Sequence, residues 1–361
     1  MRSAICERLG VEFPLFAFSH CRDVVAAVTN AGGFGVLGAV AYSAEQLDTE
    51  LSWIDAQVGG RPYGVDVLVP GRTEGPRATV PESHLSFTTD LLQRYGVPFA
   101  ASPAGFGDRV SARGATELIE VALRHPVGLI ASALGPPPPQ MVSMAREADV
   151  PVAALVGTVE HARRQVAAGA DIIVAQGTEA GGHTGEIATM VLVPQVVDAV
   201  APVPVLAAGG IASGRQMAAA MALGAEGVWC GSVWLTTEEA ETPPSVKRKM
   251  LAASSLDTVR SRSRTGKPAR QLASAWTAAW DSGEDSPGPL GMPLQMVLAE
   301  SAMARVVQAA ERGEPGAVEL ANYFVGQVVG QLDQVKPARQ VVYEMIEEFG
   351  DAIERLSRLT E

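Results

Sequence analysis

The feature that most constrains this chain is a unit that recurs three times: an amphipathic helix, a glycine and a short apolar strand. The three copies span residues 23–40, 160–176 and 215–232. In each copy a glycine (Gly32, Gly169 or Gly224) stands where a left-handed turn is expected to end the helix. The strands that follow are continuously apolar rather than alternating, which indicates that both of their faces are buried. Units of this kind predict a parallel α/β fold.

Eight apolar segments of the chain fit such strands. They lie near residues 13–18, 34–40, 63–69, 127–133, 152–156, 171–175, 203–207 and 227–231. Eight parallel strands, each followed by a helix, predict a closed (β/α)8 TIM barrel. A doubly wound open sheet is the alternative, but it usually has fewer strands. No G-x-G-x-x-G motif opens a helix after the first strand, as a dinucleotide-binding sheet of that kind would require.

Two stretches interrupt the repeat and suggest how the chain is divided. Residues 71–98 form a polar insertion that ends in a short helix, and residues from about 240 to 320 are charged or helical. We therefore expect the barrel to occupy residues 1–240 and a small helical cap, inserted after the eighth strand, to occupy residues 241–320. Residues 321–361 are expected to return to the barrel and to end in an amphipathic helix.

Composition excludes several classes of partner. The net charge of −12 and the absence of a basic run argue against binding to nucleic acid or an anionic membrane. No apolar run reaches the roughly 18–20 residues needed to span a bilayer, and the N-terminus has no signal-peptide core. A soluble, cytoplasmic protein is expected. The three cysteines, Cys6, Cys21 and Cys230, are too few and too scattered for a disulfide framework or a zinc site.

The loop after the sixth strand carries the most distinctive residues. In a barrel of this type, the active site is built from loops that follow the carboxyl ends of strands. The segment QGTEAGGHTG, residues 176–185, has four glycines, which indicates that its backbone approaches something flat or bulky closely. His183 lacks the apolar neighbours of a core histidine and can act as an acid, a base or a partner for an anion. A mobile glycine loop with a chance histidine is the alternative.

The loops after the seventh and eighth strands have the pattern of a phosphate site. They read AAGGIAS, residues 207–213, and WCGSV, residues 229–233. Glycine amides at these two positions, next to the start of a helix, form the recurrent phosphate cradle of such barrels. Tight turns without a ligand are the alternative. Because neither loop carries a positive charge, backbone amides and Ser232 are expected to bind the anion.

Together these segments resemble the nitronate monooxygenase family, formerly called 2-nitropropane dioxygenases, and the FMN-dependent enoyl-ACP reductases that share its fold. The segments FPLFAFSH, RPYGVDV, TGKPAR and YFVGQVVGQL also resemble segments of the family. The resemblance covers nearly the whole chain, and residues 71–98 and 270–315 match least. It implies a flavoprotein with FMN as its cofactor.

Position by position, the resemblance implies a set of cofactor contacts. Gln176 is expected to touch the flavin ring, Gly181 and Gly182 to lie beside the cofactor, and the backbone of Ala17 and Phe18 to reach the ring. The phosphate contacts would come from six residues, Gly209, Gly210, Trp229, Cys230, Gly231 and Ser232. His183 is expected to be the catalytic residue over the flavin face.

The chain departs from the family pattern at two places. After the first strand it has Ala17-Phe18-Ser19 where members commonly carry Ala-Pro-Met, and on the third strand it has Asp66 where they commonly carry asparagine. Asp66 is expected among the cofactor contacts. A carboxylate there would repel the anionic reduced flavin unless it is protonated or paired. Alternatively, Asp66 is a satisfied strand-end carboxylate. Both departures affect the inference that the substrate is a nitronate more than the inference that the cofactor is FMN.

The remaining histidines are weaker candidates. His84, His125 and His161 are expected to be solvated, in the polar insertion or on helix surfaces. His20 lies at the barrel mouth and can face the pocket. Next to Cys21 it suggests a metal or thiol site, but no second cysteine or carboxylate pair stands at ligand spacing. No metal is therefore expected.

The leading functional expectation is an FMN-dependent oxidoreductase that resembles nitronate monooxygenases. It would oxidise small alkyl nitronates with dioxygen, and His183, protonated or hydrogen-bonding, would stabilise the nitronate oxygens. One alternative is an NAD(P)H-dependent reductase of enoyl thioesters, with hydride passing through FMN. A non-enzyme alternative is a barrel that binds flavin or a phosphate ligand without turnover. The sequence leaves the use of NAD(P)H and the oligomeric state open.

Overall fold

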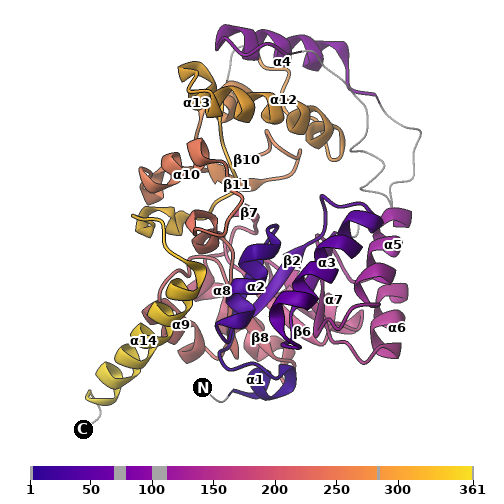
Figure 1. Ribbon diagram of the computed structural model, residues 1–361, viewed down its shortest axis with the longest axis vertical. Coiled ribbons are helices and arrows are strands. Elements are labelled where there is room, and N and C mark those ends of the chain that lie inside the picture. The colour runs from indigo at the N-terminus through magenta and orange to yellow at the C-terminus, as the bar shows by residue number, and fades with distance from the viewer. Residues whose placement is uncertain (1–2, 69–78, 100–111, 283–284, 360–361) are drawn as a thin grey trace.

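Eight parallel strands form a closed barrel in the computed structural model, which describes residues 3–68, 79–99, 112–282 and 285–359 (Figure 1). Around the barrel the strands follow the order β1-β2-β3-β4-β5-β6-β8-β9. They are β1 Leu15–Ser19, β2 Phe34–Gly38, β3 Gly64–Leu68, β4 Leu129–Ala133, β5 Val152–Val156, β6 Ile172–Gln176, β8 Val205–Ala208 and β9 Gly227–Cys230. Each overlaps one of the eight predicted segments. The predicted TIM barrel is confirmed, and the open sheet is excluded.

A helix follows each strand and belongs to the outer wall. These helices are α2 Arg22–Asn30, α3 Ala44–Val58, α5 Ala112–Ala122, α6 Pro139–Glu147, α7 Val159–Ala167, α8 Thr189–Val200, α9 Gly214–Ala222 and α14 Ala338–Ser357. The three glycines of the repeat adopt left-handed backbone, with φ of +93° at Gly32, +102° at Gly169 and +98° at Gly224. The last helix, α14, packs against α9 and α2. It is therefore the eighth wall helix and closes the ring.

Large aromatic side chains fill the barrel interior. Phe16 packs against Phe34, with ring centroids 5.1 Å apart, and stacks on Trp229 at 6.1 Å. From below, the short helix α1, Ala4–Leu9, adds Ile5 and Leu9 to this cluster. The interior is a packed core that gives the barrel mouth a rigid floor.

A cap is inserted between β9 and α14 and lies over one end of the barrel (Figure 1); its elements extend on both sides of the residues 241–320 expected from the sequence. Its elements are η1 Ser232–Thr236, α10 Pro244–Leu251, η2 Ser255–Asp257, β10 Thr258–Ser261, β11 Ala269–Leu272, α11 Ala275–Ser282, α12 Leu294–Glu311, α13 Pro315–Leu320 and η3 Gln327–Gln331. Trp276 and Trp280 are fully buried in an apolar core that is separate from the cores of the barrel. Among the described helices, none has the length and apolar character that a membrane span needs.

The insertion after β3 also belongs to the cap, which the sequence did not predict. Its helix α4, Glu82–Arg94, is longer than expected and packs on α12 (Figure 1). Phe87 and Leu91 of this helix lie in the cap core. His84 is buried on this helix and its Nε2 lies 3.1 Å from the carbonyl oxygen of Gly288, so the prediction of a solvated histidine was wrong. Residues 71–78 of the predicted insertion lie outside the described residues.

Candidate functional site

The glycine-histidine loop joins the barrel to the cap. Within it, Gly182 and His183 form a two-residue strand, β7, that pairs antiparallel with Arg270 and Ala269 of β11. Strand β11 pairs in turn with β10, so a three-stranded sheet of β7 from the barrel loop and two cap strands spans the junction (Figure 1). The predicted active-site loop is therefore held in place between the two parts of the molecule.

His183 is half-buried, and one hydrogen bond fixes its tautomer. Its Nδ1 lies 3.2 Å from the carbonyl oxygen of Pro268, which can only accept, so Nδ1 carries the hydrogen and Nε2 of the neutral ring is an acceptor. Desolvation is the main influence on the ring and holds its pKa below the usual 6.5, although the Pro268 bond acts in the opposite direction. The structure thus favours a neutral proton acceptor over the protonated ring that we considered from the sequence.

Protein packing explains most of the glycines in this loop. A Cβ at Gly177 would lie 2.0 Å from Oγ1 of Thr189, and one at Gly181 would lie 2.8 Å from the backbone nitrogen of Gly326. Gly185 meets the backbone of Gly157 in the same way. Of the four glycines only Gly182, with φ of +75°, has open space around it. Three of the close approaches inferred from the sequence are therefore contacts within the protein.

Free backbone amides gather where β8 and β9 end. Gly209 and Gly210 adopt φ of +93° and +72°, and within the described residues their amides form no hydrogen bond. The same holds for the amides of Gly231 and Ser232 across the described chain. Because β8 and β9 are neighbours, the two turns lie side by side on one rim. Unpaired amides converging in this way make an anion site, which we call the amide cradle.

The start of α9 does not contribute to the amide cradle, contrary to the sequence-based picture of a helix start. The amide of Gly214 donates to Oε2 of Glu348 at 2.8 Å, and the amide of Ala212 donates to the side chain of Gln216 at 2.8 Å. A carboxylate from α14 thus occupies the place where a helix N-terminus could hold a phosphate. The free amides lie in the turns instead.

Two of the predicted phosphate contacts have side chains that point elsewhere. Trp229 faces the barrel interior, where it stacks on Phe16. Cys230 faces outward among the wall helices, and burial raises the pKa of its thiol to about 12. Their side chains cannot reach the amide cradle. Ser232 does lie there; its Oγ accepts from the amide of Gly326 at 2.8 Å, which leaves its hydroxyl hydrogen free to donate.

Predicted ring contacts line the mouth above this floor. Phe18 is half-buried and stacks on Trp229, with centroids 6.4 Å apart. Ala17 packs outward against the wall helices, so only its backbone could meet a ligand. Gln176 ends β6 on the interior side, following Val174 by two residues, and its side-chain amide makes no hydrogen bond within the described residues. Phe18 and Gln176 therefore offer surface to a bound molecule.

Asp66 also faces the barrel interior, between Gly38 and Ala131 of the adjacent strands. Only 6% of its surface is exposed, and burial raises its pKa to about 7. No hydrogen bond reaches its carboxyl oxygens from the described residues, which argues against a satisfied strand-end carboxylate. Of the possibilities considered from the sequence, the structure favours a carboxyl group that is protonated for much of the neutral range.

Comparison with known proteins decides the family. The family model described as nitronate monooxygenase matches residues 9–348. The chain belongs to the nitronate monooxygenase family. Like its relatives, it is an oxidoreductase on a TIM barrel.

Three relatives show the range of this family. A candidate monooxygenase of Mycobacterium tuberculosis is 62% identical over 378 residues, which covers all of both chains. The (3aS,4S,5R,7aS)-5-hydroxy-7a-methyl-1-oxo-octahydro-1H-indene-4-carboxyl-CoA dehydrogenase of the same organism is 32% identical, over 80% of this chain and 71% of that one. Among solved structures, nitroalkane oxidase from Streptomyces ansochromogenes has a TM-score of 0.82 at 27% identity, covering 98% of this chain and 100% of that chain.

Two arginines of the cap, which no sequence pattern singled out, support the glycine-histidine loop of this nitronate monooxygenase family member. Arg260 and Arg270 are opposite each other in β10 and β11. Arg270 donates from Nε to the carbonyl oxygen of Thr178 at 2.8 Å, and Arg260 donates to that of Thr184 at 3.3 Å. The loop's two ends are therefore held by guanidinium groups. The TGKPAR segment was the available signal, but residue order alone does not show which loop it meets.

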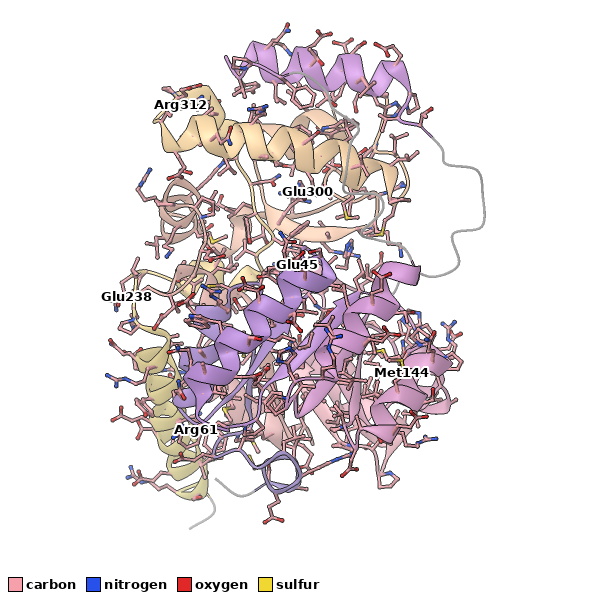
Figure 2. All side chains as sticks on the ribbon, turned by 45° about the vertical axis from the view of Figure 1, so that its right-hand side comes forward. Glu45, Arg61, Met144, Glu238, Glu300 and Arg312 are labelled. Carbon is pink, nitrogen blue, oxygen red and sulfur yellow. The ribbon has the colours of Figure 1, made fainter. Side chains whose placement is uncertain are left out.

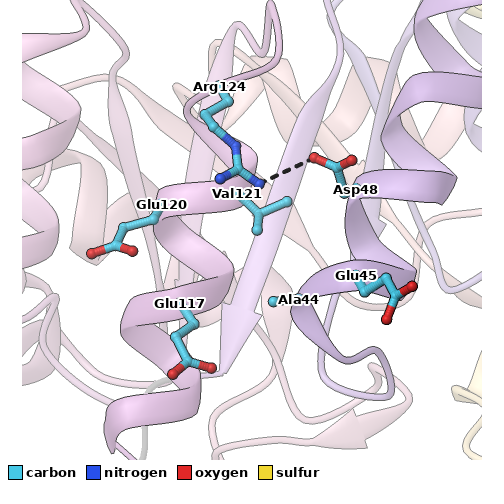
Figure 3. Close-up of a pocket in the computed structure, with 7 residues that line it drawn as sticks. All are labelled: Ala44, Glu45, Asp48, Glu117, Glu120, Val121 and Arg124. Carbon is cyan, nitrogen blue, oxygen red and sulfur yellow. Dashed lines mark hydrogen bonds and ion pairs between the residues drawn. The ribbon is translucent and has the colours of Figure 1, made fainter.

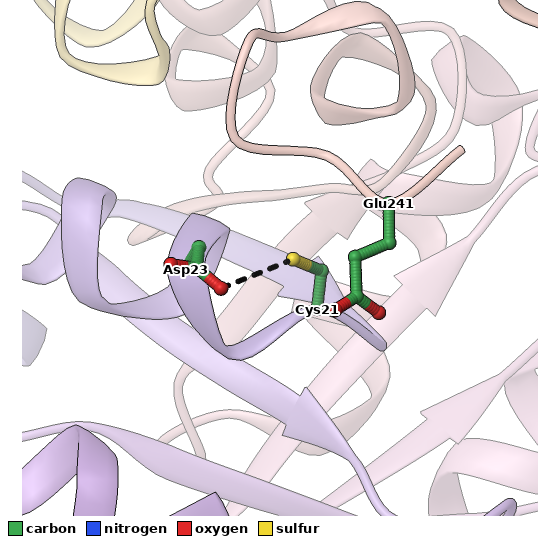
Figure 4. Close-up of side chains that lie close together, drawn as sticks. All are labelled: Cys21, Asp23 and Glu241. Carbon is green, nitrogen blue, oxygen red and sulfur yellow. Dashed lines mark hydrogen bonds between the residues drawn. The ribbon is translucent and has the colours of Figure 1, made fainter. Parts of the chain in front are cut away.

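One potential ligand cluster did form, although the sequence suggested no carboxylate pair near Cys21. Atoms of Cys21, Asp23 and Glu241 all lie within 4.8 Å of one another (Figure 4). The Cys21 thiol lies 3.1 Å from the carbonyl oxygen of Glu239, and burial raises its pKa. A protonated, hydrogen-bonded thiol is a poor metal ligand.

The pocket on the outer wall between α3 and α5 is separate from the amide cradle (Figure 3). Its volume is about 250 Å³, and four of its lining residues are acidic against one arginine, Arg124. Such a surface repels phosphate. Nearby, His125 was expected to be solvated but is mostly buried, with Nδ1 2.7 Å from Oδ2 of Asp55. His161 is exposed on α7 as predicted.

Proposed function

We propose that this oxidoreductase binds FMN and oxidises small nitro compounds, as alkyl nitronates or as the parent nitroalkanes, with dioxygen as co-substrate. The observation that carries the proposal is the amide cradle beside the His183 loop on one rim of the barrel. The nitroalkane oxidase of Streptomyces ansochromogenes, similar over nearly its whole length, supports the same chemistry.

The residues at the mouth fit FMN. Four amides that have no partner among the described residues, at Gly209, Gly210, Gly231 and Ser232, match the acceptor oxygens of a phosphate. The Ser232 hydroxyl adds a donor. A Cβ at Gly209 would lie 3.0 Å from the carbonyl oxygen of Gly177, so the turn is already as narrow as glycine allows. Phe18 and Gln176 would meet the ring system. The sequence has no adenosine-binding motif that would indicate FAD in place of FMN.

When bound, the flavin supplies the redox chemistry, while the protein supplies orientation and proton handling. His183 holds its Nδ1 hydrogen on Pro268 and presents Nε2 as a base. It can therefore take a proton from the α carbon of a neutral nitroalkane, and the cation so formed stays beside the new nitronate oxygens. A nitronate that arrives already ionised would instead require the ring to be protonated first.

A spectroscopic and anaerobic titration tests the proposal. The purified protein is expected to be yellow, and mass analysis of the released cofactor is expected to give FMN. Anaerobic addition of a nitroalkane or its nitronate should bleach the flavin, and admission of dioxygen should restore the colour. Release of FAD, or a flavin that no nitro compound reduces, would contradict the proposal.

The second candidate is a thioester oxidoreductase, and one observation favours it. A relative that is 32% identical over 80% of this chain is named as the dehydrogenase of a carboxyl-CoA thioester. The same titration separates the two. Anaerobic bleaching by NADPH, followed by reoxidation with an enoyl thioester rather than with dioxygen, would favour this candidate over nitro-compound oxidation.

A further inference from the structure

The imidazole of His20, just after the end of β1, is held in a defined position by Gly38 and Tyr42. Its Nδ1 lies 2.9 Å from the carbonyl oxygen of Gly38. A Cβ at Gly38 would lie 2.5 Å from that Nδ1, so the ring can occupy this position only because residue 38 is glycine. The hydroxyl of Tyr42 donates to the carbonyl oxygen of His20 at 2.7 Å and holds the backbone. Gly38 therefore orients the imidazole by its carbonyl oxygen and by the space that it leaves, and Tyr42 fixes the backbone that carries the ring.

One aromatic ring separates His20 from the amide cradle. The imidazole meets Phe18 edge-on, with centroids 5.1 Å apart and an interplanar angle of 78°. On its other side, Cδ1 of Phe18 lies 3.9 Å from the place where a Cβ of Gly231 would be. From the cap, Glu300 lies on the barrel side of α12 and its charge acts on the imidazole (Figure 2). His20 thus lies between the barrel mouth and the cap.

The ring has one nitrogen without a partner. Because the Gly38 carbonyl can only accept, Nδ1 carries the hydrogen, and within the described residues Nε2 makes no hydrogen bond. Surrounding protein desolvates the ring and lowers its pKa, yet the residue remains exposed to solvent. Both are expected of a group in the wall of a concave surface. At neutral pH, Nε2 is therefore an acceptor without a partner among the described residues, on a residue that solvent reaches.

We propose that His20 contacts the substrate and that its Nε2 accepts a hydrogen bond from a hydroxyl or N–H group of that substrate. The inference rests on the proposed function, since it places the substrate between the flavin site and His20. It narrows the substrate class to nitro compounds that carry a hydrogen-bond donor away from the reacting carbon. Plain alkyl nitro compounds lack the group that Nε2 would bind.

Two variants separate the two nitrogens of the ring. His20→Asn places an amide nitrogen near the position of Nδ1, so it keeps the bond to Gly38 and loses the Nε2 acceptor. His20→Gln places its amide near the position of Nε2 and keeps an acceptor there. His161→Asn, on the outer face of α7, is the matched control. FMN content and thermal stability of all three are measured first, so that loss of the fold is recognised.

The kinetic probes are 3-nitropropan-1-ol and 1-nitrobutane, which differ by a hydroxyl in place of a methyl group. The wild-type protein is expected to prefer the alcohol about tenfold in kcat/KM, the scale of one hydrogen bond. His20→Asn should abolish the preference, His20→Gln should retain part of it, and His161→Asn should leave it unchanged. Equal rates on both probes in the wild type, or a preference that survives in His20→Asn, would overturn the inference.

A measurement without turnover separates this inference from the proposed function. In NMR spectra of protein with ¹⁵N-labelled histidine, the signals lost in His20→Asn identify this ring. Its Nε2 is expected to be unprotonated. The Nε2 signal should shift when 3-nitropropan-1-ol is added but not when 1-nitrobutane is added. If neither probe reduces the flavin, the proposed function fails and the shift alone decides on His20. A ring protonated at Nε2, or one that responds equally to both probes, would overturn the inference.

Discussion

At the scale of single residues, main-chain carbonyls determine how the two mouth histidines can act. His183 bonds to Pro268 and His20 to Gly38, each through Nδ1. No side-chain substitution removes a backbone acceptor, so the tautomer of both rings is a property of the fold. In each ring the free Nε2 can accept a proton or a hydrogen bond.

We predict that His183→Asn retains FMN and loses catalysis. Asparagine can keep the bond to Pro268 but has nothing at the position of Nε2. Anaerobic stopped-flow measurement of flavin reduction by a nitroalkane should show a loss of roughly 10²–10⁴-fold, the usual scale for a positioned base. His161→Asn is the control for substitution as such. Reduction of the His183 variant at the wild-type rate would make His183 a structural residue.

The pH dependence should have opposite signs for the two forms of the substrate. The pKa of His183 lies below 6.5 because the ring is desolvated. The fraction of His183 in the neutral, basic form increases as pH rises through that pKa, so kcat/KM for a nitroalkane should rise and then level off. The fraction of protonated His183 decreases over the same range, so kcat/KM for a preformed nitronate should fall. Parallel profiles for the two substrates would count against proton transfer at His183.

Replacing Asp66 by asparagine should change how stability depends on pH. The carboxyl pKa is raised from 3.8 to about 7, so between these values the folded state binds the proton more tightly than the unfolded chain, and stability falls as pH rises. An asparagine side chain cannot ionise. The unfolding free energy of Asp66→Asn relative to wild type should therefore increase by about 2–3 kcal/mol from pH 5 to pH 8. Chemical unfolding at both pH values tests this; a constant difference would mean that Asp66 is not perturbed.

At the scale of elements, the turn after β9 permits a test without backbone strain. Gly231 has φ of −119°, and the nearest atom to an added Cβ would be 3.9 Å away, at Phe18. Gly231→Asp should therefore fold normally but place a negative charge among the free amides and lose FMN. Gly231→Asn has nearly the same shape without the charge and should retain more cofactor. Stoichiometric FMN in the Asp variant, measured by absorbance, would mean that the phosphate lies elsewhere.

The contact between α9 and α14 gives a second pair of variants with effects of opposite sign. A Cβ at Gly214 would lie 2.1 Å from the carbonyl oxygen of Met345, so Gly214→Ala must push the two helices apart, at a cost of about 3 kcal/mol. Gly350, on α14, has open space around its Cβ position, so Gly350→Ala should stabilise the helix by about 0.5–1 kcal/mol. Thermal unfolding should show the first variant below wild type and the second above it. The same sign for both would contradict this packing.

At the scale of the whole molecule, the barrel was predictable because its signals are local. A glycine such as Gly169 and the apolar strand after it are read within a few residues. Which face a strand residue occupies was not predictable, since strands buried on both faces do not alternate. Trp229 and Cys230 are adjacent and point in opposite directions, and the sequence placed both at the phosphate.

Long-range pairing accounts for the rest of what the sequence did not predict. The pairing of β7 with β11 joins His183 to Ala269, and no pattern near either residue marks the other as its neighbour. The same is true of α4, whose apolar face packs on α12. His183 and the glycine turns could be proposed as site residues from residue types alone. The support that orients them comes from the cap and needed the structure.

The place of α14 in the chain also determines when the wall of the barrel can close during synthesis. All eight strands leave the ribosome before the helix that fills the gap between α9 and α2, because the whole cap is translated in between. Folding of a nascent chain generally begins with its N-terminal part, so the new barrel must wait with part of its apolar wall uncovered. Glu348 can reach the amide of Gly214 only after the whole cap has been translated. The turn that leads from the amide cradle into α9 therefore acquires its final partner only after a long delay, while the cap is being made.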